Sequence, residues 1–397
     1  MAPETFPQML KRHRKSRGWS QQRLAEALCE VSGRATVTRQ EVYRWERGLR
    51  APKFWLPFIA TVFAVDRDEL ERALATSDAP SPTLAELLPG ERPEVELSAH
   101  QGRHVGRTAA ERLHARVHAL RLADDVIAGQ DLIVPAFREL DSAVQLLRES
   151  THTEAVGRSL RTAVGEFAQI AGWIASDAGQ HDKAERTYRL GLSAAREAGD
   201  GTLAGQLAGC LAYQWSNIGR VSDGVALAEA ALAEAGTQAP PRARALFWDR
   251  VAWARTKAGD ARATMLALGE AEEALSQHGE EDEPTWLYWV DAGELQVMEA
   301  RAYTELRRPL RAVPLLNDVL SHYDATHTRE MALYLSWLAV AYTDANEPEQ
   351  AAHVARRMLE MSEDLGSDRT SERAQVVRAS LRPFRDVPEV REVLDAA

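Results

Sequence analysis

A spacing close to 40 residues recurs through the second half of the chain. Turn residues follow one another at intervals of 40, 40, 48 and 39 residues, at Gly179, Gly219, Gly259, Arg307 and Asn346. Seven residues before each turn stands a small residue, namely Gly172, Ala212, Ala252, Ala300 and Ala339. Five residues after each turn stands another small or short residue, namely Ala184, Gly224, Thr264, Ala312 and Ala351. Closely packed helices need small residues where their backbones cross, so this register predicts a stack of helical pairs.

One copy carries the pattern most fully, with Gly172, Gly179, Ala184, Tyr188 and Gly191 in a small–turn–small–aromatic–small order. In this order the chain resembles the tetratricopeptide repeat over residues 159–365, in five repeats longer than the usual period of about 34 residues. The proline that usually ends each repeat is missing, and an insertion, residues 279–293, precedes the fourth turn. The resemblance implies a right-handed superhelix whose first helices line the concave side.

The segments around these repeats are also expected to be helical. From Arg107 onward Ala and Leu are abundant, and β-branched runs are scarce. Residues 107–158 fall outside the register, and we expect a helical pair there that serves as an N-terminal cap or in dimerisation. Residues 366–397 read as C-terminal capping helices. The pair Asp124-Asp125 is expected to be the solvated end of a helix, whereas residues 76–106, rich in Pro, Gly and Ser, predict a linker.

Near the N-terminus, residues 20–52 predict two short helices joined by a turn. A first helix, from Phe6 to Arg17, precedes them and ends at Gly18. Ser20 is a suitable N-cap for the second helix. Thr38, with Glu41 three residues later, predicts a capping box at the start of the third helix.

The pattern resembles the lambda-repressor-like, or XRE-type, helix-turn-helix domain over about residues 6–75. The residues that carry the resemblance are Arg14, Ser20-Gln21, Leu24-Ala25, Val42, Trp45-Glu46-Arg47-Gly48 and Pro52. Arg14 and Glu46 resemble the internal ion pair of that family, and we expect them to be scaffold. The connection between the second and third helices, residues 30–37, is longer than usual, which leaves the tilt of the third helix open. The chain is therefore predicted to be all-α, with an N-terminal helix-turn-helix domain (residues 1–75) followed by a TPR-like α-solenoid.

The resemblance implies DNA-contact roles by position. Arg39, Gln40 and Arg44 fall at base-reading positions of the third helix, where Arg suits guanine and Gln suits adenine. Gln21 matches the phosphate contact of the family at the N-terminus of the second helix. Further phosphate contacts are predicted at Thr38, Tyr43, Arg47, Arg50 and Lys53. The alternative for Arg39 and Arg44 is an ordinary solvated helix face.

In the repeat register, the concave side receives aromatic, amide and charged side chains, a mixture that suits an extended peptide or a small polar molecule with an apolar part. These predicted ligand-groove residues are Glu166, Gln169, Trp173, Asp177, Gln206, Tyr213, Asn217, Asp249, Trp253, Lys257 and Arg301, with Glu305, Ser336 and Asp344 at the later repeats. The alternative is that Trp173, Tyr213 and Trp253 are packed between helices.

Charge and composition narrow the function further. Residues 1–75 hold 14 Lys and Arg against 9 Asp and Glu, a net charge of +5, whereas the whole chain is at −11. A basic head on an acidic body lets the head approach phosphates.

Two cysteines predict neither a disulfide framework nor a metal cluster, and a cytoplasmic location is expected. No apolar run is long enough to span a bilayer, no signal peptide is expected, and no phosphate-loop or nucleophile motif appears in the sequence. His114 and His118, four residues apart without an H-E-x-x-H pattern, do not predict a metal site. No enzyme activity and no cofactor are expected.

These features predict a sequence-specific DNA-binding transcriptional regulator that acts as a homodimer and responds to a peptide or small-molecule effector. The resemblance extends to regulators that join an XRE-type head to a tetratricopeptide body, in the long-repeat form seen in actinobacteria. Two other hypotheses stay open. One is an interaction scaffold that binds a protein partner and uses the helix-turn-helix for docking. The other is a regulator whose body serves only for dimerisation.

Overall fold

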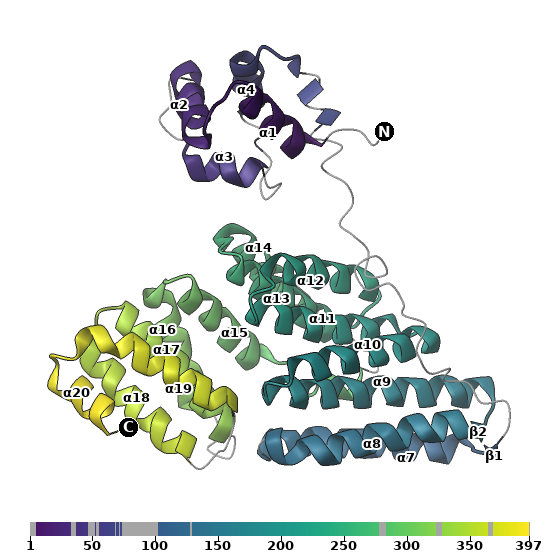
Figure 1. The fold of residues 1–397 in the computed structure, drawn as a ribbon. Helices are drawn as coiled ribbons and strands as arrows, with labels where there is room; N and C mark the ends of the chain where they lie inside the picture. Colours follow the sequence, from purple (N-terminus) through teal and green to yellow (C-terminus); the bar gives the residue numbers. More distant parts are fainter. Residues whose placement is uncertain are drawn as a thin grey trace. The chain divides into compact units, whose positions relative to one another are not determined.

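The structure is a computed structural model. It describes residues 5–32, 37–46, 52, 55–67, 69–70, 72–73, 102–127, 129–277, 283–322, 328–363 and 368–396. The chain forms two compact units, Met1–Ser81 and Pro82–Ala397, and each is described by itself (Figure 1). Most of the predicted linker, residues 76–101, lies outside the described residues. None of the described helices is both long and apolar enough to cross a membrane.

The N-terminal unit holds α1 (Phe6–Ser16), α2 (Gln21–Ser32), α3 (Arg39–Glu46) and α4 (Leu56–Phe63). The predicted caps are confirmed. Ser20 Oγ accepts the amide proton of Arg23 at 3.1 Å, and Thr38 Oγ1 accepts that of Glu41 at 3.3 Å. Hydroxyl caps satisfy amides that have no partner inside the helix, so they fix where α2 and α3 begin.

Apolar side chains of α2, α3 and α4 lie in the core of this unit. Leu24 and Leu28 of α2, and Val42 and Trp45 of α3, are fully buried together with Ile59 of α4. Val42 and Trp45 are three residues apart and therefore share one face of α3. Because that face points into the core, the opposite face of α3 is left for solvent or a partner.

The second unit is a stack of antiparallel helical pairs. The pairs are α7 (Arg107–Val126) with α8 (Gly129–Glu149), α9 (Glu154–Asp177) with α10 (His181–Ala198), α11 (Gly201–Asn217) with α12 (Val221–Ala235), α13 (Pro241–Lys257) with α14 (Ala261–Ser276), α15 (Ala292–Glu305) with α16 (Pro309–His322), α17 (Thr328–Asp344) with α18 (Pro348–Glu363), and α19 (Asp368–Leu381) with α20 (Pro388–Asp395). Figure 1 shows the first four pairs stacked in chain order, with α15–α20 beside them. An all-α fold with a repeating helical body is thereby confirmed.

The turns inside five of these pairs share one backbone geometry. All five turn residues of the predicted register have positive φ, between +52° and +88°: Gly179, Gly219, Gly259, Arg307 and Asn346. In each case the amide of the next residue donates to the carbonyl five residues earlier, for example from Gln180 to Ala175 at 2.8 Å and from Arg308 to Tyr303 at 2.8 Å. This bond is the signature of a Schellman helix end. The repeat therefore exists in the backbone, although Arg307 and Asn346 replace glycine in the last two copies.

Close packing explains the small residues of the register. A Cβ atom built on Gly172 of α9 would stand 2.6 Å from Cε1 of Tyr188 in α10. A Cβ on Gly191 would stand 2.7 Å from that of Ala168. Real Cβ contacts do not come so near, so the two helices of this pair approach at a distance that only glycine allows.

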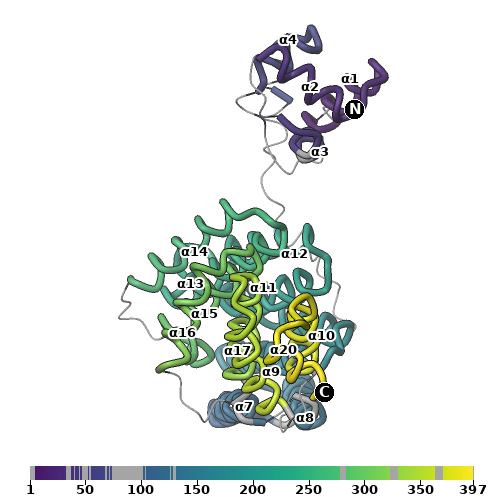
Figure 2. Tube along the Cα trace, turned by 90° about the vertical axis from the view of Figure 1, so that its left-hand side faces the viewer, coloured from purple at the N-terminus to yellow at the C-terminus, as the bar shows by residue number. Residues whose placement is uncertain are grey.

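The stack curls until its later helices meet its first. Both α17 and the short 3-10 helix η2 (Thr285–Leu287) contact α7, and in Figure 2 α17 passes in front of α9 and α11. The first helices of the pairs thus surround a central space. The described part of the body also holds one minor non-helical element, a parallel pairing of β1 (Arg103–His104) with β2 (Ser150–Thr151).

Candidate functional site

In the N-terminal unit, an ion pair joins α1 to the end of α3. Arg14 donates from Nε to Glu46 Oε1 at 2.5 Å and from Nη2 to Glu46 Oε2 at 3.0 Å, and a third bond reaches the Trp19 carbonyl at 2.7 Å. The side chain of Glu46 is 4% exposed and that of Arg14 is 11% exposed. The hydrogen bond to Glu46 raises the pKa of Arg14. This arrangement agrees with the scaffold role expected for the pair.

Gln21 belongs to the same cluster. Its Nε2 donates to Glu46 Oε2 at 2.8 Å. The bond holds the side chain at the N-terminus of α2, where amide groups and the helix dipole favour an anion. Gln21 is partly buried. A phosphate contact by this residue would therefore use donor capacity of its amide that is not engaged by Glu46.

The outer face of α3 is exposed where the structure describes it. Arg39 and Thr38 are exposed, and Tyr43 is 46% exposed. The side chains of Gln40 and Arg44 lie outside the description, although their backbones are part of α3. Three other predicted phosphate contacts, Arg47, Arg50 and Lys53, also lie outside the described residues. Two capped helices with a polar second face are the arrangement that a helix-turn-helix presents to a DNA major groove.

Residues 10–54 match the helix-turn-helix family model HTH_3. The match spans the second half of α1, all of α2 and α3, and the Arg14–Glu46 ion pair. The N-terminal unit therefore contains an XRE-type helix-turn-helix domain. The chain matches no curated protein.

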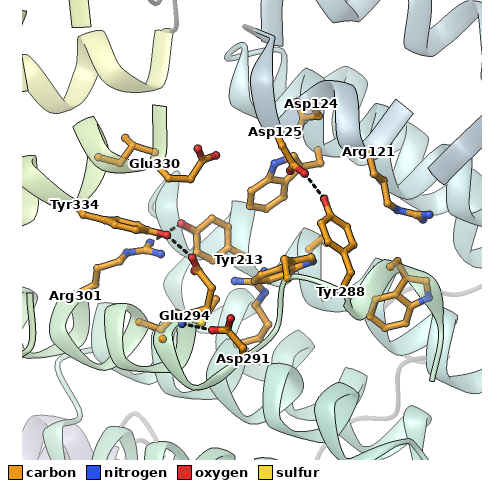
Figure 3. A pocket seen from close by; sticks show the side chains of 18 of the residues that line it. Arg121, Asp124, Asp125, Tyr213, Tyr288, Asp291, Glu294, Arg301, Glu330 and Tyr334 are labelled. Atoms are coloured by element: carbon orange, nitrogen blue, oxygen red, sulfur yellow. Dashed lines mark hydrogen bonds between the residues drawn. The ribbon is translucent and has the colours of Figure 1, made fainter. Parts of the chain in front are cut away.

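The central space of the body holds a cavity of about 710 Å³ (Figure 3). Cavities of this size are typical for drug-sized ligands. Its walls come from α7, α9, α11, α13, α15, α16, α17 and the insertion around η2. The lining residues are Arg121, Asp124, Asp125, Gln169, Ile170, Trp173, Gln206, Cys210, Tyr213, Arg250, Trp286, Tyr288, Trp289, Asp291, Gly293, Glu294, Gln296, Met298, Arg301, Asp318, Val319, Glu330, Leu333 and Tyr334.

A smaller cavity of about 250 Å³ adjoins the first and shares Trp173, Tyr213 and Arg301 with it. Together the two cavities collect most of the predicted groove residues. Gln169 and Gln206 line the larger one, and those that line only the smaller one are Asp177, Asn217, Trp253, Lys257 and Glu305.

Four predicted groove residues line neither cavity, namely Glu166, Asp249, Ser336 and Asp344. Glu166 is buried beneath the larger cavity, where it accepts from Arg121 Nη1 at 2.8 Å and lies 3.5 Å from His114 Nδ1. Burial alone would raise the pKa of Glu166, but the hydrogen bond from His114 and the Arg121 charge outweigh it and lower that pKa. Asp249 is buried beside Arg250, and its burial raises its pKa. Both carboxylates thus support arginines that face the cavity.

Aromatic rings from successive repeats form a ladder between the two cavities. The ring centroids of Trp173 and Tyr213 are 5.8 Å apart, those of Tyr213 and Trp253 are 5.9 Å apart, and Trp337 follows at 5.9 Å from Trp253. The first three residues are each 40 apart in sequence, so one repeat position builds the ladder. These rings are both packed on their neighbours and exposed to a cavity, and the two alternatives raised for them are not exclusive.

Guanidinium groups alternate with the rings. Arg250 Cζ lies 4.8 Å from the Tyr213 ring centre, and Arg301 Cζ lies 4.5 Å from that of Trp253. Arg301 also donates from Nη2 to the Tyr213 hydroxyl at 2.6 Å. Desolvated cation–π contacts of this kind hold both partners in place. The rings and guanidinium groups of the ladder are therefore held by contacts with one another.

The opposite wall was not predicted as part of a site. The insertion, residues 279–293, contributes Trp286, Tyr288, Trp289 and Asp291. Tyr288 donates to Asp125 Oδ2 at 2.6 Å across 163 residues of sequence. The prediction that Asp124-Asp125 is a solvated helix end is wrong for Asp124, which is 5% exposed. The insertion covers the end of α7, which no local pattern could show.

A second phenol–carboxylate pair lies across the cavity from the first (Figure 3). Tyr334 donates to Glu294 Oε1 at 2.5 Å. Burial raises the pKa of Glu294, although the bond from Tyr334 opposes the shift. Burial also raises the pKa of Tyr288, and its hydrogen bond to Asp125 adds to the effect. Tyr288 therefore stays protonated and donates its hydrogen bond to Asp125.

Proposed function

We propose that this protein is a transcription regulator and not an enzyme: a cytoplasmic homodimer whose N-terminal domain reads a DNA sequence and whose TPR-like body binds an effector. The observation that carries the proposal is the helix-turn-helix match at residues 10–54, with α3 capped and held by the Arg14–Glu46 pair. These bonds present one face of α3 to solvent at a fixed angle to α1.

DNA reading would follow from that exposed face. Arg39 lies at the N-terminal end of α3, where recognition helices contact base edges. Gln40 and Arg44 follow on the same helix and carry the amide and guanidinium groups that pair with adenine and guanine. Two heads of a dimer would contact half-sites about one DNA turn apart.

Effector control would use the cavity of the body. Its lining is drawn from helices that are far apart in sequence, so a bound molecule would favour one curvature of the stack over another. Such a ligand changes DNA binding only to the extent that it binds the two conformations with different affinity. A dimer interface on the body would convert the change in curvature into a change in head spacing.

The test compares single arginine variants on selected DNA. Arg39→Ala and Arg44→Ala should each lose about 1–3 kcal/mol of specific binding, or about 5- to 150-fold in affinity, and should relax specificity at one base position. Arg23→Ala is the matched control, because Arg23 lies on α2 and pairs with Glu26 and Glu30 at the surface. Wild-type affinity in both α3 variants would contradict base reading. A protein partner bound by the head, with no affinity for DNA, would point to the scaffold hypothesis.

A further inference from the structure

The larger cavity carries an excess of carboxylates. Six carboxylic acids line it, against three guanidinium groups: Asp124, Asp125, Asp291, Glu294, Asp318 and Glu330. Two of the three arginines already face a carboxylate behind the lining. Arg121 Nη1 is 2.8 Å from Glu166, and Arg250 Nη1 is 3.6 Å from Asp249. The remaining field inside the cavity is therefore acidic, which favours a cationic guest.

Buried polar atoms of the cavity lining also point to a guest. Gln206 is 3% exposed, and its Oε1 has no hydrogen-bond donor among the described residues. Arg121 and Arg250 are each 4% exposed, and the Nε atoms of both lack an acceptor there. Buried polar groups without partners are costly. A ligand with one N–H donor and an acceptor oxygen would satisfy these atoms.

Aromatic side chains of the cavity lining also favour a cationic guest. Tyr288 of the insertion donates to Asp125 at the cavity wall, and Trp289 and Asp291 line the same cavity. Aromatic faces next to carboxylates bind organic cations, because the ring quadrupole and the negative charge attract the same group. On the other side, Trp173 and Tyr213 of the ladder line the same cavity and supply apolar contacts to a ring-shaped body.

We infer that the effector is an organic amine with a ring body and an acceptor oxygen. Its ammonium group lies beside Asp125 and Tyr288, and its oxygen lies toward the N–H groups of Arg121 and Arg250. This inference rests on the proposed function only in naming the guest an effector. The binding itself concerns the body and is tested without DNA.

Three tryptophan derivatives with the same ring and a carbonyl oxygen make the test. Tryptophan amide is cationic at about pH 6.5, below the ordinary pKa of an α-amino group. N-acetyltryptophan amide is neutral, and N-acetyltryptophan is anionic. Titration calorimetry and ligand-observed NMR with the full chain should show the amine binding about tenfold or more tighter than either acetylated compound, a difference of about 1.4 kcal/mol.

A pair of N-cap variants locates the site. Asp291 caps α15 by accepting from the Glu294 amide at 2.9 Å, and Asp260 caps α14 by accepting from Ala263 at 3.1 Å. Asparagine caps as well as aspartate, so both changes keep the helix and remove one charge. Asp291→Asn combined with Asp125→Asn should weaken amine binding about tenfold, whereas Asp260→Asn, outside the lining, should leave it unchanged.

Either of two outcomes overturns the inference. One is tighter binding of the anionic compound than of the amine, which would make Arg121 and Arg250 the determinants. The other is a lack of amine binding at millimolar concentration by protein whose helicity is intact. Measurement of DNA affinity on the same sample keeps the two proposals apart. Specific DNA binding without amine binding contradicts only the ligand class, whereas amine binding without DNA binding contradicts only the regulator.

Discussion

Removal of the Glu46 carboxylate should destabilise the helix-turn-helix domain. Glu46→Ala deletes the partner of three hydrogen bonds, two from Arg14 and one from Gln21. Loss of one partner of a buried pair costs about 3–5 kcal/mol, because the remaining charge is left without compensation. Arg14 is 11% exposed and keeps its bond to the Trp19 carbonyl, so the lower end, about 3 kcal/mol, is expected.

Hydrogen exchange of the full chain measures this loss. A destabilisation of about 3 kcal/mol speeds exchange of the α1–α3 amides about 150-fold where exchange requires opening of the unit. The helices of the body serve as the internal reference, because their exchange should not change.

Glu30→Ala is the control for this prediction. Glu30 also pairs with an arginine, Arg23, at 3.1 Å, but the two side chains are 63% and 47% exposed. Such a surface pair contributes about 0–1 kcal/mol, so exchange should accelerate by no more than about fivefold. Equal effects of the two variants would show that burial of the Arg14–Glu46 pair does not hold α3 in place.

Two predictions concern the body. Gly172→Ala should destabilise the body by about 1–3 kcal/mol in urea unfolding, because the new Cβ would meet the Tyr188 ring at 2.6 Å. Gly209→Ala is the control and should stabilise the body by about 0.5–1 kcal/mol, because its Cβ would be 3.5 Å from the nearest neighbour. A change of the same sign in both variants would contradict the close packing at Gly172. The hydrogen bond to Glu166 raises the pKa of His114 in the folded protein. The contribution of this contact to the free energy of folding is therefore complete below the unfolded pKa of about 6.5, and it is lost as pH rises through the folded pKa. Thermal unfolding followed by circular dichroism should show this loss of stability with rising pH in wild type and not in His114→Gln. The same pH dependence of stability in both proteins would show that the His114–Glu166 contact does not cause the loss.

Much of the fold could be predicted from local signals in the sequence. Ser20 and Thr38 predict the starts of α2 and α3, because a cap acts within three residues of itself. The turn register found five left-handed positions, including Arg307 and Asn346, from spacing alone. Trp173 and Tyr213 were placed on a cavity because equivalent positions of successive repeats face the same side.

The other half of the cavity depends on the curvature of the stack. Tyr288 meets Asp125 because the stack curls through four pairs, α7 to α14, and the insertion after them returns to α7. That curvature is the sum of small rotations between neighbouring pairs, and no residue encodes it locally. Glu166 and Asp249 show a second limit. They share the concave side of their helices with cavity-lining residues, yet Arg121 and Arg250 stand between them and the cavity.

Recovery of bound duplexes from a random library shows whether this chain binds a specific DNA sequence. Titration of the best sequence at two salt concentrations follows. We predict a motif with two half-sites about one helical turn apart. With Arg47, Arg50 and Lys53 of each head on phosphates, affinity should fall about a thousandfold between about 50 and 200 mM salt. Recovery of no common sequence by folded protein, with and without an amine ligand, would contradict sequence-specific DNA binding.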